Sequence, residues 1–306
     1  MALRYHGFAR GVVLSVLRRH KFAPKRTQFM SSEAVSSDLV KTEKRGDVFM
    51  IGLNSPGKRN AVSPAVAKEL LKAFQQFEKE DAAKVAVLYG EGGVFCAGFN
   101  LSSLSKMDTL SSSQLVKEPV QDIAGPLGPS RMFPSKPVIA AVEGYAVAGG
   151  LELACLCDLR VVDETAVMGV FCRRFGVPLI DGGTVRLPKL IGLSRALDLI
   201  LTGRAVTAAE AKEYGLANRV VAAGTAVEEA VKLAKNIATF PQECMLTDRK
   251  SAYYSSFNAK NTLDAFQFEF ENGIKVIAKE SVKGAQSFVE GTGRHGSFSL
   301  DKKSKL

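Results

Sequence analysis

Residues 138–158 have the sequence VIAAVEGYAVAGGLELACLCD, in which one apolar run is followed by glycines and then by a second apolar run. The first run, residues 138–142, is short and continuous, which predicts a buried strand. Gly149 and Gly150 then open a helix. The first backbone N–H groups of a helix have no partner within it, and the helix dipole makes this end positive. The stretch therefore predicts a strand, a turn and a helix whose start can bind an anion.

Around this stretch, short apolar runs alternate with helical patterns. Strands are predicted for residues 48–53, 85–89, 137–142, 159–162 and 216–221. A helix begins at Ser63 and Pro64, and residues 225–278 have a helical pattern. This alternation favours an α/β fold with buried, largely parallel strands. The serine-rich residues 102–118 are expected to form a mobile loop.

The composition is that of an ordinary globular chain. Of its 306 residues, 46% are apolar and 24% are charged, which is enough for a well-buried core. The net charge of +10 lies mostly at the two ends, and residues 33–300 carry only +1. An almost neutral body gives no basic binding surface, so no nucleic-acid partner is expected.

The two ends of the chain resemble targeting signals. Residues 1–32 contain seven Arg or Lys and no acidic residue, as in a mitochondrial transit peptide. The last three residues, Ser304-Lys305-Leu306, match the peroxisomal import tripeptide, so the peroxisomal import receptor is an expected partner. We expect a peroxisomal protein, with the mitochondrion as a second destination. The longest apolar run contains Glu143 and Glu152, so no membrane span is expected.

Few residue types remain for acid/base chemistry. The histidines are His6, His20 and His295, which nearly excludes a Ser-His-Asp centre or a histidine metal site in the body, and no metal is expected. The cysteines form no C-x-x-C pair, which suggests free thiols in a reducing compartment. Proton transfer is therefore left to carboxylates, Lys, Tyr or Cys.

A second glycine-containing turn, residues 95–101 (FCAGFNL), also follows a predicted strand. One backbone N–H from each of the two turns would be enough to hold an oxyanion between them. Glu152 lies three residues beyond Gly149, in the first turn of the predicted helix. It is either an acid/base group or a carboxylate that the helix dipole stabilises.

These segments together resemble the enoyl-CoA hydratase/isomerase (crotonase) family. Residues 138–158 resemble its signature, and residues 56–62 and 95–98 resemble its coenzyme A-binding segments. Residues 182–192 and 201–216 are similar to later family segments. The resemblance implies an α/β spiral of ββα units over residues 38–240. It also implies a C-terminal helical region, 241–295, that builds trimers or hexamers, followed by the tail 296–306.

The resemblance also implies roles for particular residues. The N–H groups of Phe99 and Gly149 would form an oxyanion hole for the thioester oxygen of an acyl-CoA, and Glu152 would be the principal acid/base group. Coenzyme A is then part of the substrate, and no separate cofactor is expected. The residues expected to contact the substrate are Arg59, Ala61, Ala97, Asn100, Leu101, Cys172 and Arg174.

The sequence departs from the hydratase pattern at one position. Alignment with the family places Cys172 where hydratases carry a second acid. Cys172 either contacts the substrate at that position or is an inert buried thiol. Some branches of the family have a functional Asp in the next loop, where Asp181 stands, although Asp181 would also suit a helix N-cap. Arg173 and Arg174 would either recognise a substrate carboxylate or lie at the surface.

Three functions stay open on these residues. The first is hydration or double-bond isomerisation of an enoyl-CoA in fatty acyl-CoA metabolism, since one carboxylate suffices to remove and return a proton. The second is decarboxylation or hydrolysis of a carboxylated acyl-CoA. The third is acyl-CoA binding without catalysis, after loss of the second acid.

Overall fold

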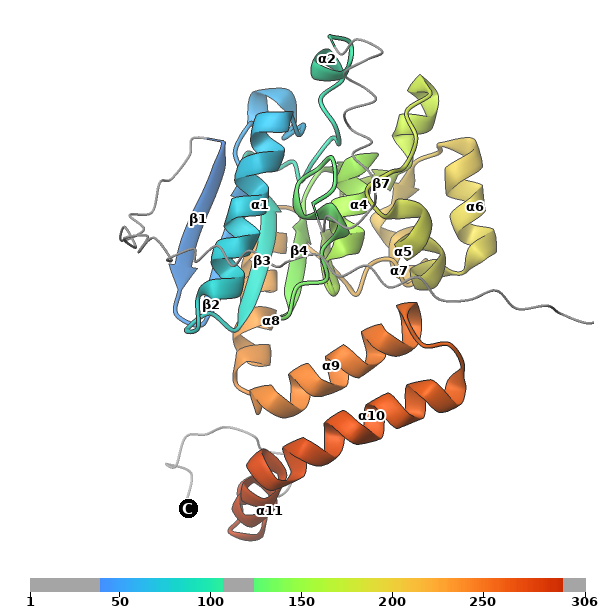
Figure 1. Cartoon of the computed structure of the whole chain (residues 1–306). Helices are drawn as coiled ribbons and strands as arrows, with labels where there is room; N and C mark the ends of the chain where they lie inside the picture. Colours follow the sequence, from blue (N-terminus) through green and yellow to red (C-terminus); the bar gives the residue numbers. More distant parts are fainter. Residues whose placement is uncertain (1–38, 107–123, 294–306) are drawn as a thin grey trace, which may run out of the picture. The chain divides into compact units, whose positions relative to one another are not determined.

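The computed structural model describes residues 39–106 and 124–293 (Figure 1). The basic leader 1–32, residues 107–118 of the serine-rich segment and the C-terminal tripeptide lie outside the described residues. Two sheets carry the fold. The larger has the strand order β1-β2-β3-β4-β6-β9, and the smaller has the order β5-β7-β8.

In the larger sheet, β1 is antiparallel to β2, and every other neighbouring pair is parallel. Its strands are β1 (Val40–Arg45), β2 (Val48–Leu53), β3 (Val85–Gly90), β4 (Val138–Val142), β6 (Leu159–Asp163) and β9 (Arg219–Val221). Parallel strands need helices on both faces, which explains their continuous apolar sequences. The predicted α/β class with a largely parallel sheet is confirmed.

The residues of β2 alternate between two clusters of buried side chains. Phe49 and Ile51 pack with α1 (Pro64–Lys79), whereas Val48 and Met50 pack with α8 (Ala226–Ala238). Successive strand residues face opposite sides, so α1 and α8 cover opposite faces of the sheet. The predicted start of α1 is also confirmed, because the Ser63 side chain accepts from Val66 N.

The smaller sheet follows directly from β4. Its strands are β5 (Tyr145–Val147), β7 (Val167–Gly169) and β8 (Val206–Thr207). Gly144, at φ +57, joins β4 to β5, and a Cβ added there would lie 2.5 Å from Gly93 O. Only glycine fits this turn, which carries the chain into the smaller sheet. The short strands β5, β7 and β8 and the antiparallel strand β1 were not predicted from the sequence.

The remaining helices between the strands are α2 (Leu101–Leu104), α4 (Gly149–Leu156), α5 (Gly183–Ile191), α6 (Leu193–Thr202) and α7 (Ala208–Tyr214). The loop predicted for residues 102–118 is therefore helical at its start, because the Asn100 side chain caps α2 by accepting from Ser103 N. Short 3-10 turns occupy Pro56–Lys58, Pro129–Arg131 and Phe171–Phe175.

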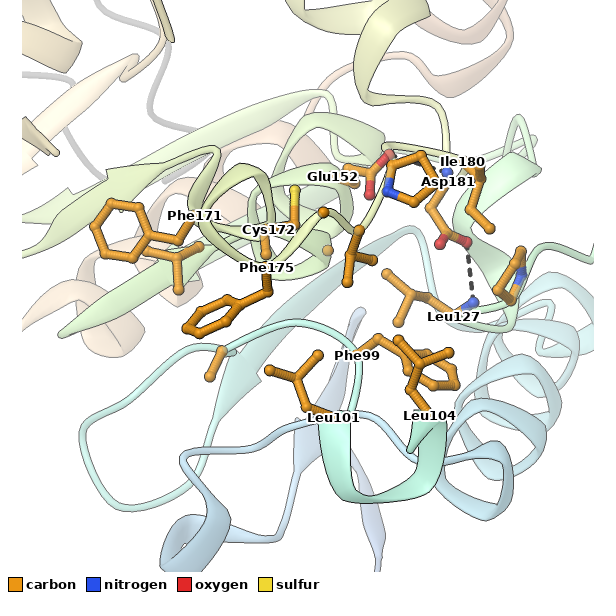
Figure 2. Close-up of a pocket in the computed structure, with 18 residues that line it drawn as sticks. Phe99, Leu101, Leu104, Leu127, Glu152, Phe171, Cys172, Phe175, Ile180 and Asp181 are labelled. Carbon is orange, nitrogen blue, oxygen red and sulfur yellow. Dashed lines mark hydrogen bonds between the residues drawn. The ribbon is translucent and has the colours of Figure 1, made fainter. Parts of the chain in front are cut away.

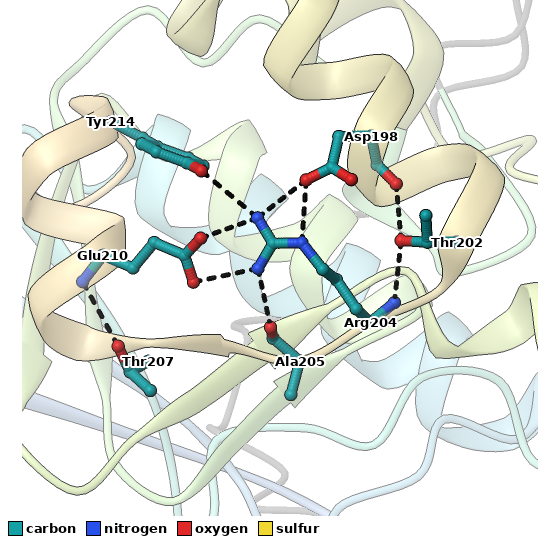
Figure 3. Close-up of polar contacts among 7 residues, drawn as sticks. All are labelled: Asp198, Thr202, Arg204, Ala205, Thr207, Glu210 and Tyr214. Carbon is teal, nitrogen blue, oxygen red and sulfur yellow. Dashed lines mark hydrogen bonds and ion pairs between the residues drawn. The ribbon is translucent and has the colours of Figure 1, made fainter.

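One guanidinium joins two of these helices. Arg204 forms ion pairs with Asp198 of α6 and Glu210 of α7, at 2.7 and 2.6 Å (Figure 3). It also donates to Tyr214 Oη over 3.2 Å. The turn between α6 and β8 is thereby tied to α7.

The predicted helical region after residue 225 is confirmed. After α8 come α9 (Gln242–Phe257), α10 (Thr262–Val276), a π-helical turn (Ile277–Ser281) and α11 (Val282–Val289). α9 and α10 lie side by side (Figure 1), and the rings of Tyr254 and Phe268 stack between them at 3.9 Å. None of the helices in the described ranges is both long enough and apolar enough to cross a bilayer.

Candidate active site

The two glycine-containing turns lie against each other. Cys96 N donates to Tyr145 O over 2.8 Å, and Val147 N donates to Cys96 O over 3.1 Å. Gly98 has φ +90, and a Cβ added there would lie 2.8 Å from Gly149 N. Gly98 is therefore required both by its backbone conformation and by the close approach of the second turn.

The backbone N–H groups of Phe99 and Gly149 have no acceptor in the described part of the chain. Val62 pairs with the groups on either side of Phe99, since it donates to Gly98 O and accepts from Asn100 N. This pairing leaves the Phe99 N–H pointing away from Val62. Gly149 is the first residue of α4, where the N–H has no partner within the helix. Two free donors thus belong to adjacent turns.

Glu152 lies in the first turn of α4 and is only 3% exposed. Its Oε1 accepts from Asp181 N at 2.9 Å and from Gly183 N at 2.8 Å. Within the described residues, no side-chain oxygen shielded from solvent lacks a hydrogen-bond partner. Since Oε2 of Glu152 has no partner among these residues, it is accessible. Burial, together with the nearby Asp181, raises the pKa of Glu152 to about 7.

Asp181, like Glu152, has one carboxylate oxygen that accepts hydrogen bonds and one without a partner among the described residues. Its Oδ1 accepts from Leu127 N at 2.9 Å and from the Ser130 hydroxyl, whereas Oδ2 has no partner in the described part of the chain. Oδ2 is accessible by the same argument. Burial raises the pKa of Asp181. The N-cap interpretation of Asp181 is wrong, because Gly182 is the N-cap residue of α5 and no side chain caps that helix.

A cavity of about 520 Å3 joins these groups (Figure 2). Phe171 and Phe175 lie at one end, and Ile180 and Asp181 lie at the other. Among the described residues of its lining, the polar side chains are Glu152, Asp181 and Cys172, and the others contribute apolar side chains or backbone. The predicted site residues that line it are Ala97, Phe99, Leu101, Gly149, Glu152, Cys172 and Asp181.

Some lining residues were not predicted. Leu104, Pro126, Leu127, Phe171, Phe175 and Ile180 also face the cavity. Leu127 is fully buried, and its side chain lies 2.5 Å from the position that a Cβ on Gly149 would occupy. No spacing or motif in the sequence marks these residues, because they enter the site from several short segments that are far apart in the chain.

Four predicted substrate contacts lie outside the cavity lining. Arg59 places its guanidinium over the ring of Tyr145 at 5.4 Å, Asn100 caps α2, and Ala61 is not among the lining residues. Arg174 donates to Gly203 O and lies 3.8 Å from the ring centroid of Phe171. Contact of these four residues with substrate stays a prediction.

The alternative functions depend on the positions of Arg173, Arg174 and Cys172. Arg173 donates to Ile200 O over 3.1 Å, and like Arg174 it is absent from the cavity wall. Within the described part of the chain, the cavity lining therefore contains no arginine that could bind a substrate carboxylate. Cys172 is buried, and burial together with Glu152 raises its pKa, so the thiol stays protonated near neutral pH. Among residues 39–106 and 124–293, no cluster of three or more His, Cys, Asp or Glu is placed to hold a metal.

Comparison with known proteins assigns the family. The profile described as enoyl-CoA hydratase/isomerase matches residues 43–295. The chain belongs to the enoyl-CoA hydratase/isomerase family. Of its relatives, enoyl-CoA hydratase EchA19 of Mycobacterium tuberculosis is 34% identical over 256 residues, covering 81% of this chain and 92% of that protein.

Two further relatives agree with this assignment. A mitochondrial probable enoyl-CoA hydratase of Dictyostelium discoideum is 35% identical over 205 residues, covering 66% of this chain and 70% of that protein. The crystal structure of an enoyl-CoA hydratase from Mycobacterium tuberculosis H37Rv superposes with a TM-score of 0.75 at 32% identity. This match covers 83% of this chain and 96% of that one. Enoyl-CoA hydratase/isomerase members thus share both the sequence pattern and the fold described above.

Proposed function

We propose that the protein hydrates the double bond of a 2-enoyl-CoA thioester. The observation that carries this proposal is the pairing of Glu152 and Asp181. Each carboxylate is fixed through one oxygen and presents the other in a single apolar cavity, next to two unpaired backbone amides. Addition of water across a double bond needs one group to take a proton and another to give one.

The free N–H groups of Phe99 and Gly149 form the oxyanion hole in this proposal. When water adds to the β-carbon of the enoyl thioester, negative charge develops on the thioester oxygen. Fixed backbone dipoles in an apolar cavity stabilise such a charge without reorganising. The adjacency of the two turns, with Gly98 against Gly149 N, supports a common target for both donors.

Glu152 is the base. Its carboxylate takes a proton from water through Oε2 while the oxygen of that water bonds to the β-carbon. A pKa of about 7 means that a substantial fraction is ionised near neutral pH, while the group remains basic enough to accept a proton. The two backbone hydrogen bonds to Oε1 hold the carboxylate in place.

Asp181 is the acid. Burial raises its pKa, which favours the protonated form that this step requires. Its proton passes to the α-carbon as the enolate collapses, so the α-carbon gains a proton and the β-carbon a hydroxyl. Transfer of a proton from Glu152 to Asp181 through solvent restores the starting state, and the net reaction is addition of one water. In this proposal Asp181 takes the place of the acid that hydratases carry at the position of Cys172.

Isomerisation of a 3-enoyl-CoA is the second candidate. It is favoured by the pKa of about 7 at Glu152, because a group that both removes and returns a proton works best near the ambient pH. In that reaction Glu152 removes a proton from the α-carbon and returns one to the γ-carbon. Asp181 is then dispensable, and this distinguishes the two candidates.

The deciding experiment compares both reactions in three proteins. Purified wild type, Glu152→Gln and Asp181→Asn are assayed with 2-enoyl-CoA for hydration and with 3-enoyl-CoA for isomerisation. Hydration that is lost in both variants supports the proposal, and isomerisation lost only in Glu152→Gln supports the second candidate. Glu164→Gln is the matched control, since this carboxylate accepts from Ala223 N at an exposed site outside the cavity. Absence of both reactions in wild type contradicts both candidates.

The acyl group and the assembly belong to the same proposal. The apolar lining supports a hydrocarbon acyl chain, as in fatty acyl-CoA metabolism. Exposed apolar side chains on α10, namely Leu263, Phe266, Phe270 and Ile274, support a homotrimer or hexamer. Light scattering coupled to size exclusion measures the assembly, and a monomer at micromolar concentration contradicts it.

The compartment is likewise a proposal. The mitochondrial relative from Dictyostelium discoideum supports mitochondrial import, and Ser304-Lys305-Leu306 underlies the peroxisomal alternative. Imaging of tagged chains that lack either residues 1–32 or the last three residues separates the two. A distribution that neither deletion changes contradicts both.

A further inference from the structure

The carboxylate of Asp181 is held by a segment far from it in sequence. Its Oδ1 accepts from Leu127 N at 2.9 Å and from the hydroxyl of Ser130, which is 51 residues away. Ser130 is fully buried and is not part of the cavity lining. It therefore touches the acid without being able to touch a substrate in the cavity.

We propose that Ser130 is a positioning residue for Asp181. Its hydroxyl and the Leu127 N–H together occupy Oδ1, so that Oδ2 is the oxygen that carries the proton toward the α-carbon of the substrate. This inference rests on the proposed function, since it assigns Ser130 a role in the acid step of that reaction.

The turn at residues 125–128 positions the Leu127 N–H and leaves space for its contact with Asp181 Oδ1. Gly125 N donates to Gly128 O over 2.8 Å, and Gly128 N donates to Gly125 O over 2.9 Å, which fixes the direction of the Leu127 N–H. A Cβ added at Gly125 would lie 2.7 Å from Asp181 Oδ1 and closer still to the Ser130 hydroxyl. Glycine at this position leaves the space in which the hydroxyl and the carboxylate meet.

Arg186 fixes the backbone of Ser130. Its buried guanidinium donates to Ser130 O over 2.5 Å and to Met132 O over 2.9 Å. Both carbonyls belong to the same short segment, and Arg186 itself lies in α5, just after Asp181. Arg186 therefore ties the segment that contains Ser130 to the helix that follows Asp181. This contact limits the movement of Ser130 away from Asp181 Oδ1.

The charged and titratable groups around Asp181 come from four elements. Asp181 raises the pKa of Glu152 of α4, whereas Arg131 and Arg186 lower the pKa of Asp181. Cys172 lines the same cavity with a protonated thiol. The hydrogen bond from Ser130 lowers the pKa of Asp181, against the larger effect of burial. Its removal must therefore raise that pKa, while every other named group stays in place.

The test uses Ser130→Ala in the full chain, with Ser135→Ala as the matched control. The Ser135 hydroxyl also donates to a carboxylate, that of Glu78, but at an exposed site. We expect Ser130→Ala to lower kcat for hydration by about tenfold or more, with KM changed less than about twofold, because the bond that fixes Oδ1 and stabilises the carboxylate left after proton transfer is lost but no substrate contact is. Carbon-13 NMR titration of the Asp181 carboxyl, assigned by its loss in Asp181→Asn, should show a higher pKa.

A second variant covers the case in which Ser130→Ala does not fold. Ser130→Cys keeps nearly the same shape and a weaker donor, so a smaller loss of kcat and a smaller rise of the Asp181 pKa are expected. In the Asp181→Asn background, the serine substitution should change kcat less than about twofold. Wild-type kcat together with an unchanged Asp181 pKa in a folded Ser130 variant overturns the inference.

Failure of the proposed function has a different outcome. If wild type hydrates no 2-enoyl-CoA, or if Asp181→Asn retains full hydration, the proposed acid role of Asp181 is contradicted. The inference about Ser130 is then contradicted as well. If Asp181→Asn is inactive but the Ser130 variants match wild type in kcat and in the Asp181 pKa, only the inference is overturned.

Discussion

The backbone N–H of Asp181 donates to Oε1 of Glu152 over 2.9 Å, so the two carboxylates of the cavity are joined through the main chain of one of them. A movement of the loop before α5 would therefore disturb both groups together. The bond also orients the base, since Gly183 N approaches the same oxygen at 2.8 Å. The loop before α5 therefore positions both carboxylates that the proposed addition of water uses.

Replacement of Glu152 by Gln should abolish most of the activity while the binding of substrate persists. Gln keeps the shape and an oxygen for the two backbone donors, but it cannot accept a proton from water. We expect kcat to fall by about 10² to 10⁴. Stopped assays give kcat, and titration with an unreactive acyl-CoA gives the dissociation constant. A fall of less than about fivefold contradicts the role of Glu152 as base.

The acidic limb of the pH profile of kcat/KM should be set by Glu152. The base must be ionised, and the pKa of Glu152 is raised from its ordinary value of 4.5 to about 7, first by burial and then by Asp181. The ionised fraction therefore increases as the pH passes through about 7. A profile of kcat/KM between pH 5 and pH 9 measures this, and an acidic limb centred near the ordinary pKa of a glutamate contradicts it.

The same raised pKa has a consequence for stability. A carboxyl whose pKa is higher in the folded than in the unfolded state stabilises the fold below its unfolded pKa, and this contribution is lost as the pH rises through the folded pKa. A rise from 4.5 to about 7 corresponds to about 3 kcal/mol between pH 4 and pH 8. Glu152→Gln should therefore lose less stability than wild type over this range, as urea unfolding at both pH values would show. Equal losses contradict the prediction.

Gly98→Ala should damage the proposed oxyanion hole. The substitution places a methyl group 2.8 Å from Gly149 N at a residue with φ +90, so the two turns must separate. We expect kcat to fall by about 10² to 10³, the usual effect of losing one donor. Gly93→Ala is the matched control, because Gly93 has φ +73 and open space around its Cβ position. A similar loss of kcat in both variants would assign the effect to backbone strain alone.

The sequence and its family resemblance predicted Gly149 and Glu152 as site residues, but they did not predict the residues that hold Asp181. Gly149 and Glu152 belong to a strand, a turn and a helix that are continuous in the chain, so local periodicity places them. The partners of Asp181 are different, because Leu127 and Ser130 reach it across more than fifty residues through a loop without a repeating pattern. Such a contact depends on how two loops pack in three dimensions.

The substrate contacts predicted for Arg174 illustrate the same limit. An arginine next to a candidate acid position is compatible with an inward or an outward side chain. The carbonyl of Gly203, which accepts from Arg174, and the ring of Phe171 determine where its guanidinium lies. Phe171 is a neighbour in the same short turn, but Gly203 is brought to Arg174 from 29 residues away by tertiary packing, which the neighbouring sequence does not encode.

Asp158 is the last residue of the stretch 138–158, and it joins the sheet to α9. Its carboxylate pairs with Arg249 at 2.7 Å, accepts from Tyr253 Oη at 2.9 Å and accepts from Val138 N at 2.8 Å. Both charged side chains are about 15% exposed, so removal of one leaves the other poorly solvated.

Arg249→Met should therefore cost about 2 to 3 kcal/mol of folding free energy, somewhat less than for a fully buried pair. Chemical unfolding measures this, with Arg45→Met as the control, because the pair of Arg45 and Glu43 is solvent-exposed and is worth less than about 1 kcal/mol. The active-site cavity does not include Arg249, so hydration by the folded variant should stay within about twofold of wild type. If Arg249→Met and Arg45→Met lose the same stability, Asp158 does not anchor α9 through this ion pair.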